Sequence, residues 1–212
     1  MSISHELKIR LIQSSIINED TRTRVHRGIS WLKASENESL SDDLRFMCLW
    51  TSFNACYASL LEEIYKDERG KMWEFLSKLI DHDKHNSISQ CLWEDCFEQA
   101  EDIIDNPYLF RDFWQTVHGD DTEWEFNFEQ SIQKAKQCKE QRNILLYCMT
   151  VIERIYILRN QLTHGGSTHG GKMNRQQLQQ CLLIMNQFVP IIMNIIIQNP
   201  DVDWGLLMYP PL

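Results

Sequence analysis

The sequence has few residues that interrupt helices. Its 212 residues include only five prolines and eight glycines, and half of the glycines lie at 165–171. Leu, Ile, Gln, Glu and Met are frequent, and these residue types favour helices. No segment alternates polar and apolar residues as a half-buried strand does. We therefore predict an all-α fold, and the chain is long enough for one sizeable core or, at a stretch, two small ones.

The sequence also lacks a long uninterrupted apolar run. Its most apolar segment, 182–197, contains Asn186, Gln187, Pro190 and Asn194, which favours a buried helix over a membrane span. The first twenty residues have no apolar core of the kind found in secretory signals. The seven cysteines show no repeating spacing and indicate reduced thiols. We expect a cytoplasmic protein that does not contact a membrane.

Positive charge is scarce except in one region. The net charge is −9, which argues against a nucleic-acid partner. Between residues 134 and 175, however, eight basic residues stand against two acidic ones, which gives +6 locally and leaves −15 for the rest of the chain. A basic surface on an acidic protein is therefore expected in this region.

The spacing of apolar residues predicts a series of helices without a linker or an internal repeat, and thus a single domain over 1–212. After a short helix within 1–20, the expected helices lie at about 23–34, 42–65, 72–80, 87–104, 107–114, 124–138, 142–164 and 174–198. Ser41 is expected to cap the second of these. Asn54, in the middle of that helix, is expected to need a specific hydrogen bond. The tail at 201–212 is apolar enough to dock on the body of the protein.

The expected helix at 142–164 ends in an unusual group of residues, RNQLTHGG at 159–166. Its apolar residues follow a spacing of four and three, which makes a narrow buried seam. These seam residues are Ile144, Cys148, Val151, Ile155, Leu158 and Leu162. Asn160 and His164 fall roughly opposite the seam, together with Ile157, and this second face suggests a partner surface. Gly165 and Gly166 are expected to form a left-handed C-cap.

These residue types can support phosphate chemistry. The Arg159 guanidinium can hold a phosphate through two donors, and the His164 imidazole can take and return a proton near neutral pH. Asn160 can fix an imidazole tautomer or donate to an oxyanion. The same residues also fit a simpler interpretation, a helix end at which Arg and His complement the helix dipole before a glycine stop. Local features alone leave both interpretations open.

The motif Arg159-x4-His164, with Asn160 after the arginine, resembles the signature of HEPN-domain ribonucleases. A second segment, Trp50-x-x-Phe53-Asn54-Ala55-x-Tyr57, resembles the second core helix of the Apea-like branch of that family. The resemblance covers about 25–65 and 140–200. It implies a HEPN-type four-helix up-down bundle, and residues 68–135 would then be a helical insertion.

The resemblance also implies an activity and partners. HEPN ribonucleases are homodimers in which the motif helices of both subunits form one cleft. They cleave RNA without a metal or cofactor and leave 2′,3′-cyclic phosphate ends. By resemblance Arg159, Asn160 and His164 are the catalytic residues. Many members are toxins or phage-defence effectors, paired in some cases with an antitoxin, and others are inactive modules that bind RNA, nucleotide or a partner such as a nucleotidyltransferase.

Other patterns are weaker. Arg154, Lys172 and Arg175 are assigned to RNA-phosphate binding, although Lys172 and Arg175 fit a solvated surface equally well. His82, His85, Cys91 and Cys96 are metal-ligand types, but the cysteine spacing does not match a zinc knuckle, and we expect no metal. His118 and His169 are expected in solvated loops. Trp73, Trp93, Trp114 and Trp124 fit core packing better than base stacking.

Overall fold

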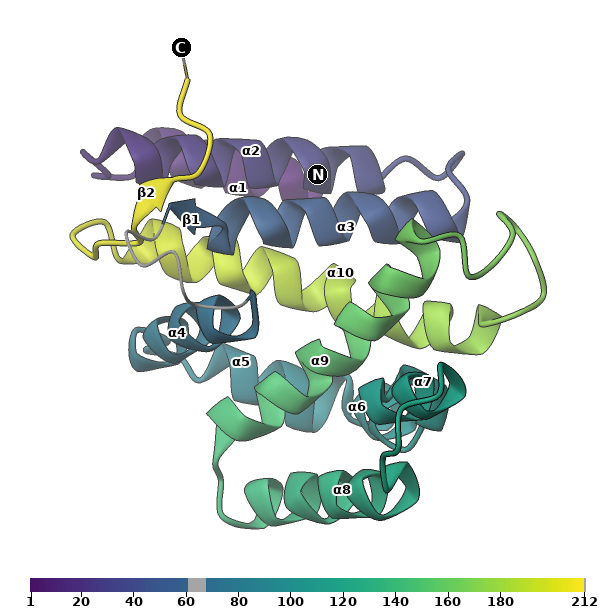
Figure 1. The fold of residues 1–212 in the computed structure, drawn as a ribbon. Helices are drawn as coiled ribbons and strands as arrows, with labels where there is room; N and C mark the ends of the chain where they lie inside the picture. The colour runs from purple at the N-terminus through teal and green to yellow at the C-terminus, as the bar shows by residue number, and fades with distance from the viewer. Residues whose placement is uncertain (61–67, 212) are drawn as a thin grey trace. The chain divides into compact units, whose positions relative to one another are not determined.

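The computed structural model describes residues 1–60 and 68–211, and within them the fold is all-α, as predicted (Figure 1). Its contacts divide the chain into two compact units. The first unit consists of Met1–Ser87 and Met185–Leu212, and the second of Ile88–Ile184. Helix α10 begins in the second unit and ends in the first.

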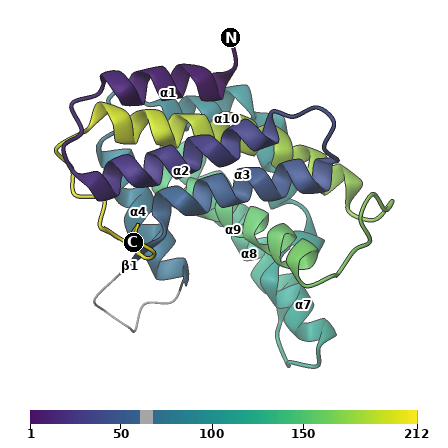
Figure 2. The same cartoon turned by 90° about the horizontal axis from the view of Figure 1, so that it is seen from above.

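The first unit is built on a helical hairpin. Its elements are α1 (Ile3–Gln13), α2 (Glu19–Ser35), α3 (Asp42–Tyr57), β1 (Ser59–Leu60), α4 (Glu68–Asp81), the C-terminal half of α10 (Arg175–Gln198) and β2 (Leu206–Leu207). Helices α2 and α3 run antiparallel, with α1 beside α2 (Figure 2). The helices approach closely at Gly28, where an added Cβ would lie 3.0 Å from the Met193 sulfur and 3.2 Å from the Cys56 sulfur. Ser52 donates to the Gly28 carbonyl at 2.6 Å across the same contact.

Arg24 fastens the end of this hairpin. The side chain is fully buried, and its guanidinium donates to the carbonyls of Cys56 and Gly205 at 2.6 and 2.7 Å. The Cys56 carbonyl lies in the last turn of α3, where no intrahelical donor is available. Burial lowers the pKa of Arg24, while its carbonyl partners compensate for part of the lost hydration.

The expected helix at about 42–65 ends earlier than predicted, at Tyr57. Ser41 caps its start as expected, with its hydroxyl accepting from the Leu44 amide at 3.4 Å. After Ala58 the backbone pairs with the C-terminal tail instead of continuing the helix, with Ser59 opposite Leu207 and Leu60 opposite Leu206. The tail therefore docks as predicted, but through a short strand pairing that the sequence pattern did not indicate. Residues 61–65 of the predicted helix lie outside the described residues.

The central helix of the second unit is α9. The elements of this unit are α5 (Ser87–Gln90), the π-helix η1 (Cys91–Asp95), α6 (Phe97–Ile104), the 3₁₀-helix η2 (Pro107–Leu109), α7 (Arg111–Val117), α8 (Trp124–Glu140), α9 (Ile144–Thr163) and the start of α10. Helices α6 and α8 and the turn η2 pack on α9. The predicted helix at 87–104 is thus divided by a π-turn, in which the Cys96 amide donates to the Cys91 carbonyl at 2.8 Å. The expected four-helix core takes α2 and α3 from the first unit, α9 from the second and α10 from both, so it stays a prediction.

One of the described helices, α10, is long and apolar enough to cross a membrane by length and composition. Its most apolar 18-residue window is 61% buried inside the protein. A core helix of a soluble protein has the same properties, so this helix by itself does not indicate a membrane protein.

Candidate functional site

The motif lies at the carboxyl end of α9, as the sequence predicts. The central seam residues Cys148, Val151, Ile155 and Leu158 are fully buried. The opposite face becomes more exposed toward the helix end, where Asn160 is half-buried and His164 is exposed. The seam of α9 therefore packs in the protein core, and the carboxyl end of the helix with the motif is accessible to solvent.

The helix ends in a two-glycine stop. Gly165 adopts the left-handed conformation, with φ at +72°. The Gly166 amide donates to the Gln161 carbonyl at 2.7 Å, and the Gly165 amide to the Leu162 carbonyl at 3.4 Å. These two bonds form a Schellman motif, which satisfies carbonyls that would otherwise lack a donor. The stop fixes His164 as the C-cap residue.

Arg159 and Asn160 are joined side chain to side chain. The Arg159 Nη1 donates to the Asn160 Oδ1 at 2.9 Å, and the guanidinium carbon lies 5.7 Å from the centre of the Tyr156 ring. A guanidinium can only donate, so the amide oxygen must face it. The amide nitrogen of Asn160 is then directed away from Arg159 with two donors. Of the two expected roles of Asn160, this arrangement favours donation to an oxyanion.

His164 carries the exposed imidazole of the motif. Its backbone amide donates to the Asn160 carbonyl at 2.9 Å, which sets the two residues one turn apart on α9. Over residues 1–60 and 68–211, no side chain forms a hydrogen bond with its ring. Both ring nitrogens are therefore accessible for proton transfer to a bound molecule.

Two polar residues that the sequence did not single out fasten the motif end. The Gln161 Nε2 donates to the Tyr108 carbonyl at 2.6 Å, and the Asn174 Nδ2 donates to the Gln161 Oε1 at 2.7 Å. These bonds tie the turn η2 and the end of the loop that follows α9 to one side chain of the motif. Tyr108 itself is 49% exposed. The position of Gln161 inside the motif is the only sequence signal that points to this role.

Arg154 does not belong to a phosphate-binding surface, which corrects the expectation. The residue is 2% exposed, its Nε donates to the Ile104 carbonyl at 3.3 Å and its Nη2 to the Ser131 hydroxyl at 2.9 Å. Its guanidinium carbon also lies 4.7 Å from the centre of the Phe110 ring. Burial lowers its pKa to about 10. The side chain is an interior connector between α9, α6 and α8, and RNA cannot reach it.

The other residues assigned to phosphate binding lie beyond the glycine stop. Lys172 is exposed in the loop after α9, and Arg175 is half-buried as the first residue of α10. Both stay candidates for contacts with phosphate.

The weaker patterns take ordinary structural places. Among the described residues, no group of three or more His, Cys, Asp or Glu side chains is arranged to hold a metal ion. Cys91 and Cys96 are buried, and the His82 Nδ1 lies 2.8 Å from the Lys78 carbonyl. His118 and His169 are exposed, as expected.

The tryptophans mostly pack against other aromatic rings. Trp114 and Trp124 each meet Phe113 edge-on, at centroid distances of 5.2 and 5.1 Å, and Trp93 packs against Tyr147 at 6.0 Å. Trp73 differs, because it is 39% exposed.

Comparison with protein-family models, with curated proteins and with solved structures finds no match to this chain.

Proposed function

We propose that the chain is a metal-independent endoribonuclease of the HEPN type, with Arg159, Asn160 and His164 as its catalytic residues. The observation that carries the proposal is the exposed His164 imidazole, held by the glycine stop one turn after the linked Arg159 and Asn160 side chains. A proton carrier, a permanent cation and a neutral donor thus share the accessible end of one buried helix. These are the groups that RNA cleavage without a metal requires.

The proposed reaction uses the 2′-hydroxyl of RNA as the nucleophile. The His164 imidazole takes the hydroxyl proton, and the 2′-oxygen attacks the adjacent phosphorus. The bond from phosphorus to the 5′-oxygen of the next nucleotide breaks, and an imidazolium returns a proton to that oxygen. The products are a 2′,3′-cyclic phosphate and a 5′-hydroxyl. Arg159 and the Asn160 amide nitrogen stabilise the negative charge on the phosphorane oxygens.

The proposed enzyme is a homodimer. One chain supplies a single His164, whereas the reaction needs a base for the 2′-hydroxyl and an acid for the leaving oxygen. A second copy meeting the first through the face with Ile157 and Asn160 would supply the second imidazole. Ile157 is half-buried in the single chain, as a residue at such a contact can be.

The cellular role of the proposed enzyme would be that of a cytoplasmic toxin or phage-defence effector, held inactive by an antitoxin where one is present.

A second candidate is a non-catalytic HEPN module that binds RNA, a nucleotide or a partner protein such as a nucleotidyltransferase antitoxin. One observation favours it. The Schellman motif and the pairing of Arg159 with Asn160 and Tyr156 also give the motif residues a purely structural role in ending α9.

The decisive experiment incubates the full chain with total cellular RNA in excess EDTA. The enzyme hypothesis requires cleavage that survives chelation, yields 2′,3′-cyclic phosphate ends, and is lost in His164→Ala and Arg159→Ala. Matched controls are His26→Ala, an exposed histidine on α2, and Arg111→Ala, an exposed arginine on α7. Both controls should cleave as the wild type does, and circular dichroism should show that every variant is folded.

Two results would favour the non-catalytic module instead. One is intact RNA with the wild type, and the other is equal cleavage by wild type and the two motif variants. Growth arrest on expression that disappears with His164→Ala would support the toxin role separately. The dimer is tested by sedimentation at micromolar concentration, where a monomer would contradict a site shared between two copies.

A further inference from the structure

The first unit contains a cavity of about 530 Å³ that the proposed ribonuclease site does not use. Helices α2 and α3, the start of α4 and the C-terminal tail contribute its walls. Its volume lies within the range of small-molecule sites, about 300–1,000 Å³. All its lining residues belong to the first unit, whereas the motif on α9 belongs to the second.

The tail that forms one wall is fastened at two points. The strand β2 pairs with β1, and two residues later the Arg27 Nη1 donates to the Tyr209 carbonyl at 2.7 Å (Figure 1). Residues 182 positions apart in the sequence therefore meet at the cavity. A fixed wall of this kind makes the cavity a preformed feature of the fold.

Two aromatic side chains that line the cavity are open to solvent. Trp31 is 45% exposed on α2, and Tyr209 is 75% exposed on the tail. Exposed aromatic surface is unfavourable in water, at about 25 cal/mol for each Å² of apolar area. Such rings at a cavity offer faces on which a planar base can stack.

Asn54 contributes a carboxamide to the same cavity. The sequence predicted a specific hydrogen bond for this residue, but over residues 1–60 and 68–211 its side chain has no hydrogen-bond partner. It is only half-buried, so both its amide donors and its carbonyl acceptor can reach a bound molecule. A carboxamide pairs well with the polar edge of a nucleobase.

The charged residues that the structure describes around the cavity are positive. Arg27 and Lys71 line it, and none of its described lining residues is acidic. This is notable in a chain with a net charge of −9. Two half-buried cations beside exposed aromatic rings suit a ligand that joins a phosphate to a planar ring.

We propose that this cavity binds a nucleotide, with the base stacked on Trp31, its edge at Asn54, and its phosphate at Arg27 and Lys71. The nucleotide is either a free mononucleotide or the terminal residue of an RNA strand, which present the same chemistry. The site does not depend on the proposed ribonuclease activity.

Calorimetric titration of the full chain with AMP, adenosine and a short single-stranded oligoribonucleotide tests this site. Trp31→Ala should raise the Kd for both AMP and adenosine about tenfold, because it removes a stacking face. Lys71→Gln should raise the Kd for AMP about tenfold and leave that for adenosine unchanged, because only AMP carries the phosphate.

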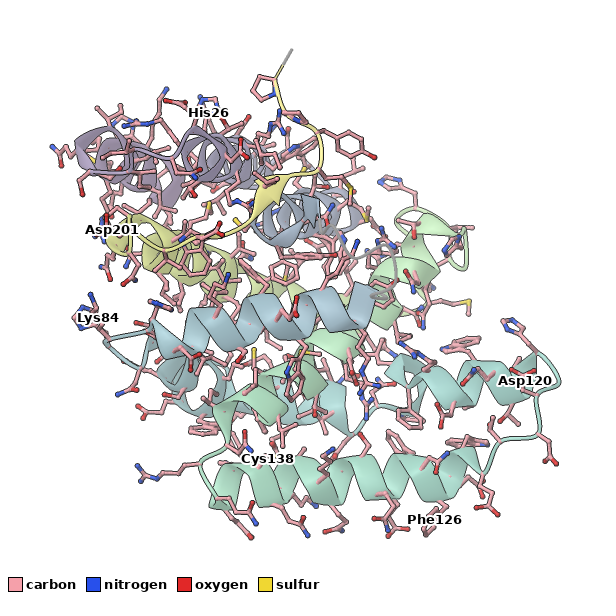
Figure 3. All side chains as sticks on the ribbon, turned by 60° about the vertical axis from the view of Figure 1, so that its left-hand side comes forward. His26, Lys84, Asp120, Phe126, Cys138 and Asp201 are labelled. Atoms are coloured by element: carbon pink, nitrogen blue, oxygen red, sulfur yellow. The ribbon has the colours of Figure 1, made fainter. Side chains whose placement is uncertain are left out.

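The controls match each variant in chemistry. Trp73→Ala removes an exposed tryptophan of α4 that does not line the cavity, and Lys84→Gln removes a surface lysine of the same unit (Figure 3). Both should bind as the wild type does. His164→Ala should also bind normally, so a failure of the ribonuclease proposal would leave this result unaffected.

Tighter binding of AMP than of the oligoribonucleotide would identify a free nucleotide as the ligand, and the reverse order would identify an RNA end. Absence of saturable binding of both at roughly 1 mM would overturn the proposal. So would binding that neither Trp31→Ala nor Lys71→Gln weakens.

Discussion

Replacing Arg154 by Ala tests whether this cation stabilises the second unit or binds RNA. The wild-type guanidinium holds the Ile104 carbonyl and the Ser131 hydroxyl and lies over the Phe110 ring, at 2% exposure. The variant loses two hydrogen bonds and leaves the Ile104 carbonyl without this donor, at a cost of about 1–3 kcal/mol. The lost packing and the cavity add to this, so we expect a destabilisation of about 3–5 kcal/mol.

The assay is urea denaturation of wild type and Arg154→Ala, together with the salt dependence of RNA binding at a temperature where both are folded. An interior role predicts a large fall in the urea midpoint and an unchanged salt slope. A phosphate contact predicts the opposite pattern, a small change in stability and a slope reduced by about one. The second pattern would refute our assignment of Arg154 to the interior. Lys172→Ala, which removes an exposed cation of the same basic region, is the matched control for the salt slope.

Two further predictions concern local features. Gly165→Ala should destabilise the protein by about 1 kcal/mol, because an alanine would have to keep the left-handed φ of +72°. An added Cβ would meet no atom within 4 Å, so no clash adds to this cost. Thermal denaturation measures the effect, and an unchanged melting temperature would contradict it. Cys48 should react with a disulfide reagent well before the other cysteines, because it is half-buried and they are buried. Burial raises the pKa of Cys56 to about 12, so its reactive thiolate is scarce at neutral pH and becomes common only as the pH approaches that value. Equal rates for Cys48 and Cys56 in the native protein, followed by mass spectrometry, would count against this burial.

The sequence by itself determined the local features of the candidate site. Cys148, Val151, Ile155 and Leu158 are buried, as their spacing predicts. Residues three and four positions apart lie on the same face of any α-helix. The left-handed stop at Gly165 and the exposure of His164 follow from residues that are neighbours in the chain. These features depend on backbone geometry over a few residues, so a sequence pattern is sufficient to predict them.

Only the tertiary structure decided the features that join distant segments. Arg154 and Lys172 are both cationic, and the sequence does not indicate which of them is buried. Arg154 is an interior residue because Ile104, Phe110 and Ser131, which lie outside α9, pack against it. Helix α3 ends at Tyr57, and the backbone after it pairs with the tail at 206–207, more than a hundred residues later. The same pairing brings that tail to the cavity that Asn54 also lines, which we propose binds a nucleotide. Burial and hydrogen-bond partners in these places depend on which distant segments pack together, and the local periodicity of the sequence does not predict such packing.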